Sequence, residues 1–350
     1  MIRSVRARAP GKLVLLGEYA VLTPGEPGMV MAVDRYAEVS VRPSRVSEIW
    51  SDGEGALYRW RIEDRVRFGV ERGFPRFAGK ALAVALDYLA RLGIHPSPFR
   101  IDIEAGSLAG PRGKYGLGSS AAVVTAVVGA VLAAAVSDRG LITPDLVFEL
   151  ALGAHRQVQD GGSGIDVAAS VYGGFLHYRA GPATFGVGRR RVVETIKPAV
   201  PPVILVGYSG ESVKTAPRVL AYTAWRAANC RSYHTFLDGS RTNVSGLIQD
   251  WQSGQDLGIA RIARGRDLLV DLGRRLGLSM ETPELFRMNV LAKTCGGAAK
   301  PSGSGGGDVG VAFLPTSVAR DKLARAWGWA GIEVLDLTPS RSGLTFHPAV

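Results

Sequence analysis

A glycine-rich segment in the first half of the chain reads Gly113-Lys114-Tyr115-Gly116-Leu117-Gly118-Ser119-Ser120-Ala121-Ala122. Glycines let a backbone wrap with its N–H groups pointing inward, and the apolar run that follows predicts a helix over residues 119–136. The N-terminal end of a helix carries a partial positive charge, which favours a bound anion. The two serines add hydroxyls that can bind phosphate or Mg²⁺. The segment therefore predicts a phosphate-binding loop, with a plain turn before a helix as the alternative.

This loop differs from the two best-known nucleotide-binding patterns. No Lys precedes the serine pair, so it is not a GxxxxGK[ST] loop, and the third glycine of GxGxxG is absent. Taken alone, the loop indicates only that an anion lies at the start of a helix.

Lysine is scarce, and its positions point to the same chemistry. Residues 9–12 read Ala-Pro-Gly-Lys, and Gly17-Glu18-Tyr19 follows shortly after. Strand-like segments flank Pro10 and Gly11, which predicts a turn that holds Lys12 at the start of a strand. Lys12 is the only Lys before residue 80. We interpret it as a functional cation rather than as a solvated surface residue.

Two further glycine-rich segments lie later in the chain. The first reads Gly162-Ser163-Gly164-Ile165-Asp166 and places a carboxylate at the start of a short predicted helix. This carboxylate is either a helix N-cap or a catalytic group held in a cleft. The second reads Lys300-Pro301-Ser302-Gly303-Ser304-Gly305-Gly306-Gly307-Asp308 and enters a predicted strand. So many glycines favour close approach of the backbone to a ligand, with a flexible linker as the alternative.

Length and composition exclude several classes of protein. The chain has 350 residues, 46% of them hydrophobic and 21% charged, which is typical of a globular protein with one large or two medium domains. The most apolar run, residues 121–136, is shorter than the ~20 residues of a membrane span, and no signal-peptide pattern follows the N-terminus. Two cysteines do not make a disulfide scaffold, which favours a cytoplasmic location. The net charge of +11 comes with scattered Arg and no basic stripe, which favours a small anionic substrate over nucleic acid.

The predicted elements divide the chain near residue 195. Before it we expect a sheet-rich start over the first 45 residues, then helices and strands at residues 77–92, 99–103, 119–136, 144–159, 166–171 and 175–178. Pro201, Pro202 and an apolar run mark the change. Beyond it we expect helices at residues 216–229, 256–276, 283–294 and 318–327, with strands at residues 309–314 and 333–337. The closing strand–helix–strand pattern indicates an α+β, ferredoxin-like second half.

In these segments the sequence resembles the GHMP kinases, the superfamily of galactokinase, homoserine kinase, mevalonate kinase and phosphomevalonate kinase. Three motifs match in order between residue 9 and residue 308, so the resemblance spans nearly the whole chain. Within the superfamily, the details are most similar to the phosphomevalonate kinases. Tyr19 stands where mevalonate kinases usually carry His, and His155 stands where they usually carry a metal-binding Glu. The segment 209–218 matches less clearly.

The resemblance implies a two-domain α+β fold, with an S5-like ATP-binding domain over residues 1–195 and a ferredoxin-like domain over residues 196–350. It implies transfer of the ATP γ-phosphoryl group to 5-phosphomevalonate in the mevalonate route to isoprenoids, with ATP and Mg²⁺ as cofactors. Lys12 and Asp166 are the expected catalytic residues, and Ser120 and Glu18 the expected metal ligands. The expected nucleotide-binding residues are Lys114, Gly116, Leu117, Gly118, Ser119, Ser120 and Ala121. The expected acceptor-binding residues are Tyr19, Ser163, Gly164, Ser212, Lys214, Thr215, Arg218, Ser302 and Gly303, of which those at 212–218 are chosen because hydroxyls and cations before a helix start suit an anion.

Two other functions remain open. One is mevalonate kinase or another GHMP kinase that acts on a sugar or an alcohol. The other is a GHMP-fold sensor that binds a nucleotide without turnover, although Lys12, Ser120 and Asp166 are all present and speak against it. We expect no membrane or nucleic-acid partner, and a homodimer is compatible with the sequence.

Overall fold

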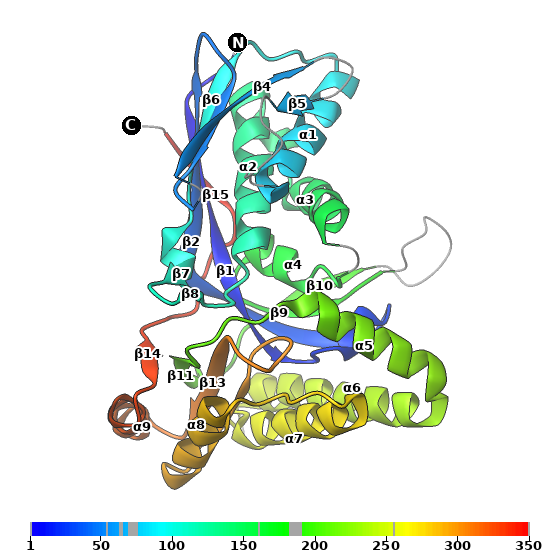
Figure 1. Ribbon diagram of the computed structural model, residues 1–350, viewed down its shortest axis with the longest axis vertical. Coiled ribbons are helices and arrows are strands. Elements are labelled where there is room, and N and C mark those ends of the chain that lie inside the picture. Colours follow the sequence, from blue (N-terminus) through cyan, green and yellow to red (C-terminus); the bar gives the residue numbers. More distant parts are fainter. Residues whose placement is uncertain are drawn as a thin grey trace.

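A computed structural model describes residues 2–53, 55–62, 66–68, 76–159, 162–181, 191–254 and 256–348. The described chain forms two bodies stacked along the long axis of the molecule, each built on its own main sheet (Figure 1). This two-domain α+β architecture confirms the fold class predicted from the sequence.

The larger sheet holds most of the N-terminal half. Its strands are β1 (Val5–Leu16), β2 (Pro27–Pro43), β3 (Glu48–Ser51), β4 (Ala56–Ile62), β5 (Val66–Phe68), β6 (Phe99–Glu104), β9 (Phe175–Arg179), β10 (Val192–Ile196) and β15 (Thr345–Pro348). The order is β10-β9-β2-β6-β3-β4-β5, and β1 pairs with β2 and β15. The pair β3–β6 is parallel, and β1, β2 and β9 pair antiparallel with their neighbours.

The turn predicted at Pro10 and Gly11 is wrong, because β1 continues straight through both residues. Pro10 pairs with Tyr36 and Gly11 with Val33, so the irregularity is a shift of register opposite residues 34 and 35. A Cβ on Gly11 would lie 2.7 Å from Leu108 Cδ2 and from the Leu117 carbonyl oxygen. Glycine at this position therefore lets the phosphate loop pack directly on the strand.

Four helices of the N-terminal half pack on the larger sheet: α1 (Arg76–Arg91), α2 (Ser119–Ala135), α3 (Pro144–Val158) and α4 (Ile165–Tyr172). α2 is apolar on all sides, as expected for a helix that is buried all round. β1 and β2 cover one side of it, and α1 and α3 cover the other (Figure 1). The N-cap of α3 is Thr143, whose hydroxyl accepts the N–H of Leu146. Within the described residues, no helix is both long and apolar enough to cross a membrane.

The second sheet has the ferredoxin-like arrangement. Its strands are β11 (Val203–Tyr208), β12 (Ala298–Pro301), β13 (Val309–Leu314) and β14 (Glu333–Leu335), in the order β12-β13-β11-β14 with antiparallel neighbours. The connecting helices are α5 (Thr215–Ala228), α6 (Cys230–Ser253), α7 (Ile259–Leu276), α8 (Pro283–Thr294) and α9 (Ser317–Trp329). Reading the strands in chain order gives the β-α-β-β-α-β pattern, with several helices in the first connection.

Side chains on the two faces of this sheet belong to different parts of the core. Along β13, Val311 and Phe313 join the large core shared with α6 and the first sheet, while Ala312 and Leu314 pack with α8 and α9. This alternation follows from the two-residue period of a strand. One face of the small sheet therefore packs in the core that the two bodies share.

The chain ends beside its own beginning. After β14, residues 338–348 return to the first sheet, where β15 pairs with β1 and Val5 lies opposite Pro348. Figure 1 shows this red segment running back along the sheet. The first sheet therefore runs to Ile196 at the end of β10 and the second begins at Val203 in β11, and only β15 returns to the first sheet.

Short elements complete the described chain. They are a hairpin of β7 (Ala109–Gly110) and β8 (Gly113–Lys114) and the 3-10 helices at Ala20–Leu22, Gly106–Leu108 and Arg139–Leu141. The hairpin brings Lys114 to the edge of the phosphate loop.

Candidate functional site

The phosphate loop ends in a helix N-terminus whose N–H groups have no side-chain cap. Gly116 has φ 81 and Gly118 φ 77, values in the left-handed region that glycine adopts readily. Gly118 is the N-cap of α2, and it supplies no side chain to accept the first N–H groups of the helix. Uncapped N–H groups at a helix start are available to bind an anion, and phosphate binding by this loop stays a prediction.

Lys12 closes this loop from the side of β1. Its backbone N–H donates to the Leu117 carbonyl at 2.8 Å, and its ammonium donates to the Gly116 carbonyl at 2.9 Å. Burial lowers the pKa of this ammonium, and the negative charges of Asp166, Asp308 and Glu18 oppose that shift. The chain thus holds a partly dehydrated cation next to the place where phosphate would sit.

One buried histidine connects the loop to the acidic residue at the start of α4. The Ser120 hydroxyl lies 3.2 Å from Nε2 of His155, and the same nitrogen lies 3.7 Å from an oxygen of Asp166. His155 is 3% exposed, and its ring contacts that of Phe77 with the two planes tilted by 32°. Asp166 is partly exposed, and its other oxygen accepts the N–H of Val167 at 2.9 Å. Ser120 and Asp166 are 46 residues apart in the sequence, and the fold places both side chains next to the same nitrogen of His155.

Ser163 and Gly164 form the turn before α4. The Ser163 hydroxyl accepts the Ile165 N–H at 3.3 Å, and its carbonyl accepts the Tyr178 hydroxyl at 2.5 Å. Ser163 is buried, and a Cβ on Gly164 would lie 2.7 Å from Leu152 Cδ1. In this structure both residues serve to aim the first turn of α4, and hence Asp166.

The third glycine segment is fastened to the first. The Ser302 hydroxyl donates to the Val14 carbonyl at 3.1 Å, and the Tyr19 hydroxyl donates to the Ser304 carbonyl at 2.7 Å. Burial raises the pKa of Tyr19 to about 12, so its hydroxyl stays a donor. No atom lies within 4 Å of a Cβ placed on Gly303, so this glycine borders open space. Ser302 and Tyr19 therefore hold the segment, and Gly303 faces outward.

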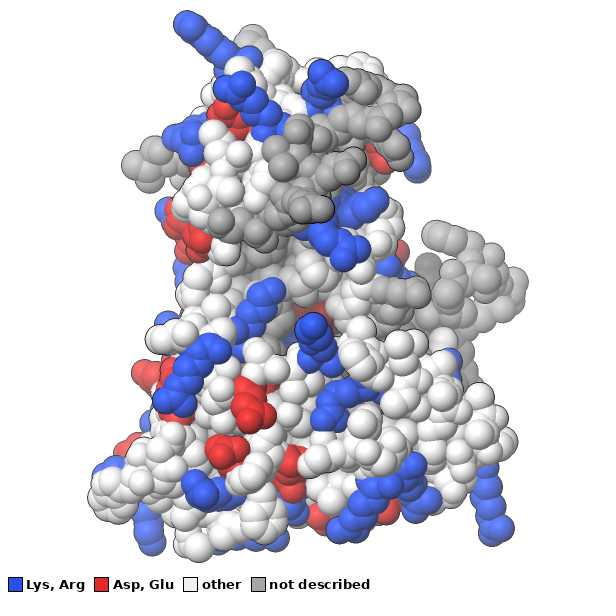
Figure 2. All heavy atoms as spheres, viewed as in Figure 1, with Lys and Arg blue, Asp and Glu red and all other residues white. Residues whose placement is uncertain are grey.

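The segment at 212–218 lies across the interface between the two bodies. The Ser212 hydroxyl donates to the Lys114 carbonyl at 2.6 Å, and the side chains of Lys114, Lys214 and Thr215 are exposed. Arg218 donates to the Ser279 carbonyl at 2.6 Å and covers Gly306. Figure 2 shows this face hollowed between the two halves, with Lys and Arg side chains beside the hollow.

Comparison with known proteins identifies the relatives of this chain. The family model described as GHMP kinases N terminal domain matches residues 79–174. A phosphomevalonate kinase from a Streptomyces species is 33% identical to this chain, over 98% of this chain and 99% of that protein. The chain belongs to the GHMP kinases.

Other proteins are similar to this chain at lower identity. The mevalonate kinase of Thermococcus sibiricus is 26% identical over 99% of both chains. A protein of Listeria innocua superposes with a TM-score of 0.89 at 29% identity, over 99% of this chain and 100% of that one. The Streptococcus pneumoniae phosphomevalonate kinase, solved with phosphomevalonate and AMPPNP, superposes with a TM-score of 0.80 at 24% identity, over 95% of this chain and 99% of that one.

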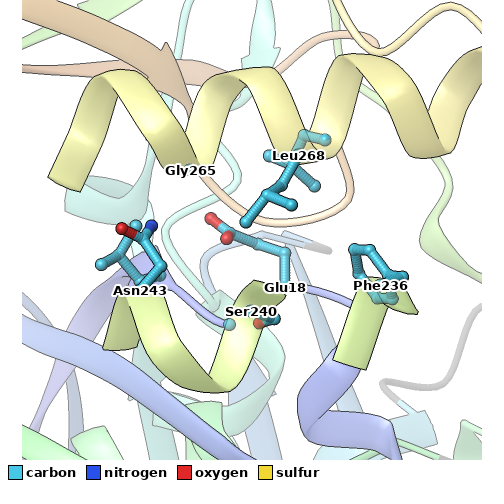
Figure 3. Close-up of a pocket in the computed structure, with 9 residues that line it drawn as sticks. Glu18, Phe236, Ser240, Asn243, Gly265 and Leu268 are labelled. Carbon is cyan, nitrogen blue, oxygen red and sulfur yellow. The ribbon is translucent and has the colours of Figure 1, made fainter. Parts of the chain in front are cut away.

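In this GHMP kinase, Glu18 is not placed as the expected metal ligand. Its carboxylate forms an ion pair with Lys300, and both side chains are almost fully buried. Lys300 also donates to the Pro301 carbonyl at 2.6 Å. Figure 3 shows Glu18 between α6 and α7, in a small cavity shared with Ser240 and Asn243. The physical reason is charge neutralisation, because a buried carboxylate needs a partner and Lys300 supplies it.

The sequence pattern assigns no role to two residues at the GHMP kinase site. His155 was noted only for the resemblance, and no sequence spacing indicates that its ring lies between Ser120 and Asp166. Asp308 ends the third glycine segment, and its charge acts on Lys12 across 296 positions of sequence. A charged residue directly after a run of glycines was the available signal for Asp308.

Proposed function

We propose that this chain is a phosphomevalonate kinase, which transfers the γ-phosphoryl group of ATP to 5-phosphomevalonate and yields 5-diphosphomevalonate and ADP. The observation that carries the proposal is the position of Lys12, held by the carbonyl of Gly116 and facing the charge of Asp166. A cation between a phosphate loop and an acid is what in-line phosphoryl transfer requires. The Streptomyces relative, 33% identical over 98% of this chain, supports the choice of acceptor.

In this proposal the loop and Lys12 bind the nucleotide phosphates. The N–H groups of residues 116–121 hold the β- and γ-phosphates, and the Lys12 ammonium stabilises the charge on the group being transferred. A phosphate oxygen of the acceptor forms a bond to the γ-phosphorus while the bond from that phosphorus to the bridging oxygen breaks. ADP leaves with the electron pair.

Asp166 orients the acceptor and takes a proton when the acceptor phosphate still carries one. The second pKa of a phosphate monoester is about 6, so near neutral pH most acceptor molecules need no base. His155 keeps Asp166 and Ser120 in place through its ring nitrogen. We expect that positioning, more than proton transfer, is the main contribution of this acid.

Mg²⁺ is part of the same proposal. No group of three or more His, Cys, Asp or Glu side chains within the described residues could hold a metal by itself. This fits Mg²⁺ in a kinase, which keeps several waters and binds chiefly to substrate phosphates. The Ser120 hydroxyl would hold it, and the ion would neutralise charge on the phosphates.

The acceptor carries a carboxylate and a phosphate, and the exposed groups beside the loop suit both. Lys114, Ser212, Lys214 and Thr215 are exposed, Ser212 contacts Lys114, and all four side chains can donate to anionic oxygens. Arg218 is engaged with Ser279 and would contribute its charge rather than its donors. Because its substrates are small anions and both cysteines are free, we place the enzyme in the cytoplasm.

The proposal is tested by measuring ADP release with mevalonate, 5-phosphomevalonate, homoserine and galactose in parallel. We expect turnover with 5-phosphomevalonate alone. Turnover with mevalonate instead would favour the second candidate, since several relatives at 26% identity are mevalonate kinases. Nucleotide binding without any turnover would identify a sensor.

A further inference from the structure

Asp308 adopts a left-handed backbone conformation, which glycine takes freely and which Asp and Asn adopt more readily than other residues. Its φ is 57, and within the described chain it shares a positive φ outside glycine only with Tyr19. Three glycines precede it, so a glycine here would have been the low-energy choice. The side chain must therefore provide something that glycine cannot.

The surrounding loop holds Asp308 in this conformation. Its N–H donates to the Glu211 carbonyl at 2.7 Å, and its carbonyl accepts the Ser209 N–H at 2.9 Å. One carboxylate oxygen accepts the Val213 N–H at 3.2 Å. The residue is thus fixed by the loop that joins β11 to α5.

The carboxylate points at the phosphate loop of the other body. A Cβ on Gly116 would lie 2.5 Å from Cγ of Asp308 and 2.6 Å from its Oδ2. A negative charge here repels a phosphate anion, so the carboxylate itself neither donates to a nucleotide phosphate nor neutralises it. Burial also raises the pKa of the Asp308 carboxyl, against the Val213 N–H and the Lys12 charge. The cation that the Asp308 charge acts on is Lys12.

Lys12 needs such a partner because burial lowers the pKa of its ammonium. The charged groups that act on it are Asp166 at the start of α4, Asp308 before β13, and Glu18 after β1. Glu18 is neutralised by Lys300, and Asp166 is the group proposed to meet the acceptor. Asp308 is therefore the one of these three acids that neither Lys300 nor the acceptor engages.

We infer that Asp308 is a positioning residue of the second domain, which holds Lys12 as a charged ammonium against the phosphate loop. The inference rests on the proposed kinase function. It predicts that the negative charge of Asp308, not the shape of its backbone, is what turnover requires.

Three variants separate charge from shape. Asp308→Asn keeps the side-chain volume, an acceptor for the Val213 N–H and a residue that tolerates positive φ, but removes the charge. Asp308→Gly keeps the backbone conformation and removes the side chain. Glu211→Gln is the matched control, because it removes a charge from an exposed side chain of the same loop that does not act on Lys12.

The readouts are kcat, kcat/KM against pH, and binding of AMPPNP against pH. For Asp308→Asn and Asp308→Gly we expect kcat to fall about tenfold and the alkaline loss of kcat/KM to move about one pH unit lower, since a nearby opposite charge shifts a pKa by about that much. AMPPNP should bind at neutral pH as well as before or more tightly, and lose affinity at a lower pH than in the wild type. Glu211→Gln should match the wild type.

Wild-type kcat and pH profiles in Asp308→Asn would overturn the inference, and so would a fall in kcat that leaves both pH profiles unmoved. A wild-type Asp308→Gly would show that only the backbone conformation matters, which also overturns it. If the wild type itself turns over none of the acceptors, the proposed function fails. The AMPPNP profile then decides the role of Asp308 on its own.

Discussion

At the scale of single residues, Lys12 combines two opposing requirements. It must be charged to stabilise a transferring phosphoryl group, and it is buried enough that its charged form is disfavoured. Its surroundings resolve the conflict with acids from three different segments rather than with one tight ion pair. A loosely shared cation can turn to phosphate without first breaking a salt bridge.

Replacing Lys12 by Met should abolish most turnover and leave the fold intact. We expect kcat to fall by about 10²- to 10³-fold, as when one preorganised donor is removed from a transition state. Met fills a similar volume and needs no hydration, so the midpoint of thermal unfolding should stay the same or rise. Steady-state kinetics and a melting curve on the same sample check both statements, and near-wild-type kcat would remove Lys12 from the catalytic residues.

The pH dependence of the wild type follows from the same residue. Burial lowers the pKa of Lys12 from its ordinary 10.5, so kcat/KM should be lost on the alkaline side at a pH below 10.5. The free energy of unfolding changes with pH in the opposite direction to that expected for a lysine stabilised by a salt bridge. The folded chain releases the Lys12 proton first, so the cost of burying it is present at lower pH and is relieved as the pH rises toward 10.5.

A pH series of kcat/KM, with unfolding followed at each pH, measures both effects. Lys12→Arg is the control, because a guanidinium stays protonated throughout this range. Whatever activity this variant keeps should lack the alkaline loss. An alkaline loss at or above pH 10.5 in the wild type would show that Lys12 is not the titrating group.

At the scale of elements, the start of α2 depends on two left-handed glycines. Gly118→Ala would place a Cβ 2.9 Å from Cγ of Lys12 at a φ of 77. We expect it to cost about 1–2 kcal/mol of stability from the left-handed backbone alone, and to weaken AMPPNP binding because Lys12 is displaced. Gly153→Ala is the matched control within α3, where a Cβ would meet no atom within 4 Å. It should stabilise the chain by up to about 1 kcal/mol.

Chemical denaturation and AMPPNP titration of the two variants decide this prediction. Equal binding by Gly118→Ala and Gly153→Ala would contradict the assignment of residues 116–121 as the nucleotide loop.

Elements with strong local signals could be predicted from the sequence, and the others could not. The helices α3 and α8 have a Thr N-cap followed by Pro, and α8 was predicted with its observed bounds. The long helix α6 was missed because its polar face and internal Gly and Asn residues weaken the apolar period. β15 was missed because four residues that pair with a strand over 330 positions away carry no local signal.

The candidate site was predictable to the same extent. Glycine segments and isolated charged residues single out Lys12, Asp166 and the loop at 116–121, and the structure brings these segments close together. Contacts between distant segments were not accessible, as Glu18 shows. Its pairing with Lys300 joins residues 282 positions apart, and only the fold reveals it.

At the scale of the whole molecule, the pair Glu18–Lys300 connects the two bodies inside a shared core. We expect Lys300→Met or Glu18→Gln alone to cost about 3–5 kcal/mol, because each leaves one buried charge without a partner. The double variant should regain most of that stability, since both charges are removed together. Denaturant unfolding of the four proteins gives the coupling energy.

Activity of the double variant then tests whether Glu18 is only a partner of Lys300 or also a metal ligand. If the pair only fastens the two bodies, kcat should recover together with stability. A stable double variant without turnover would indicate that Glu18 is a metal ligand after all.

In the proposed reaction, this GHMP kinase joins two phosphates. The most direct measurement is ³¹P NMR of the product formed from ATP and 5-phosphomevalonate. We predict that the acceptor signal is replaced by two mutually coupled doublets of a diphosphate ester, at the rate at which ADP forms. Formation of ADP while the acceptor phosphorus stays a single monoester resonance would contradict the claim, because the phosphoryl group would then have gone to a hydroxyl or to water.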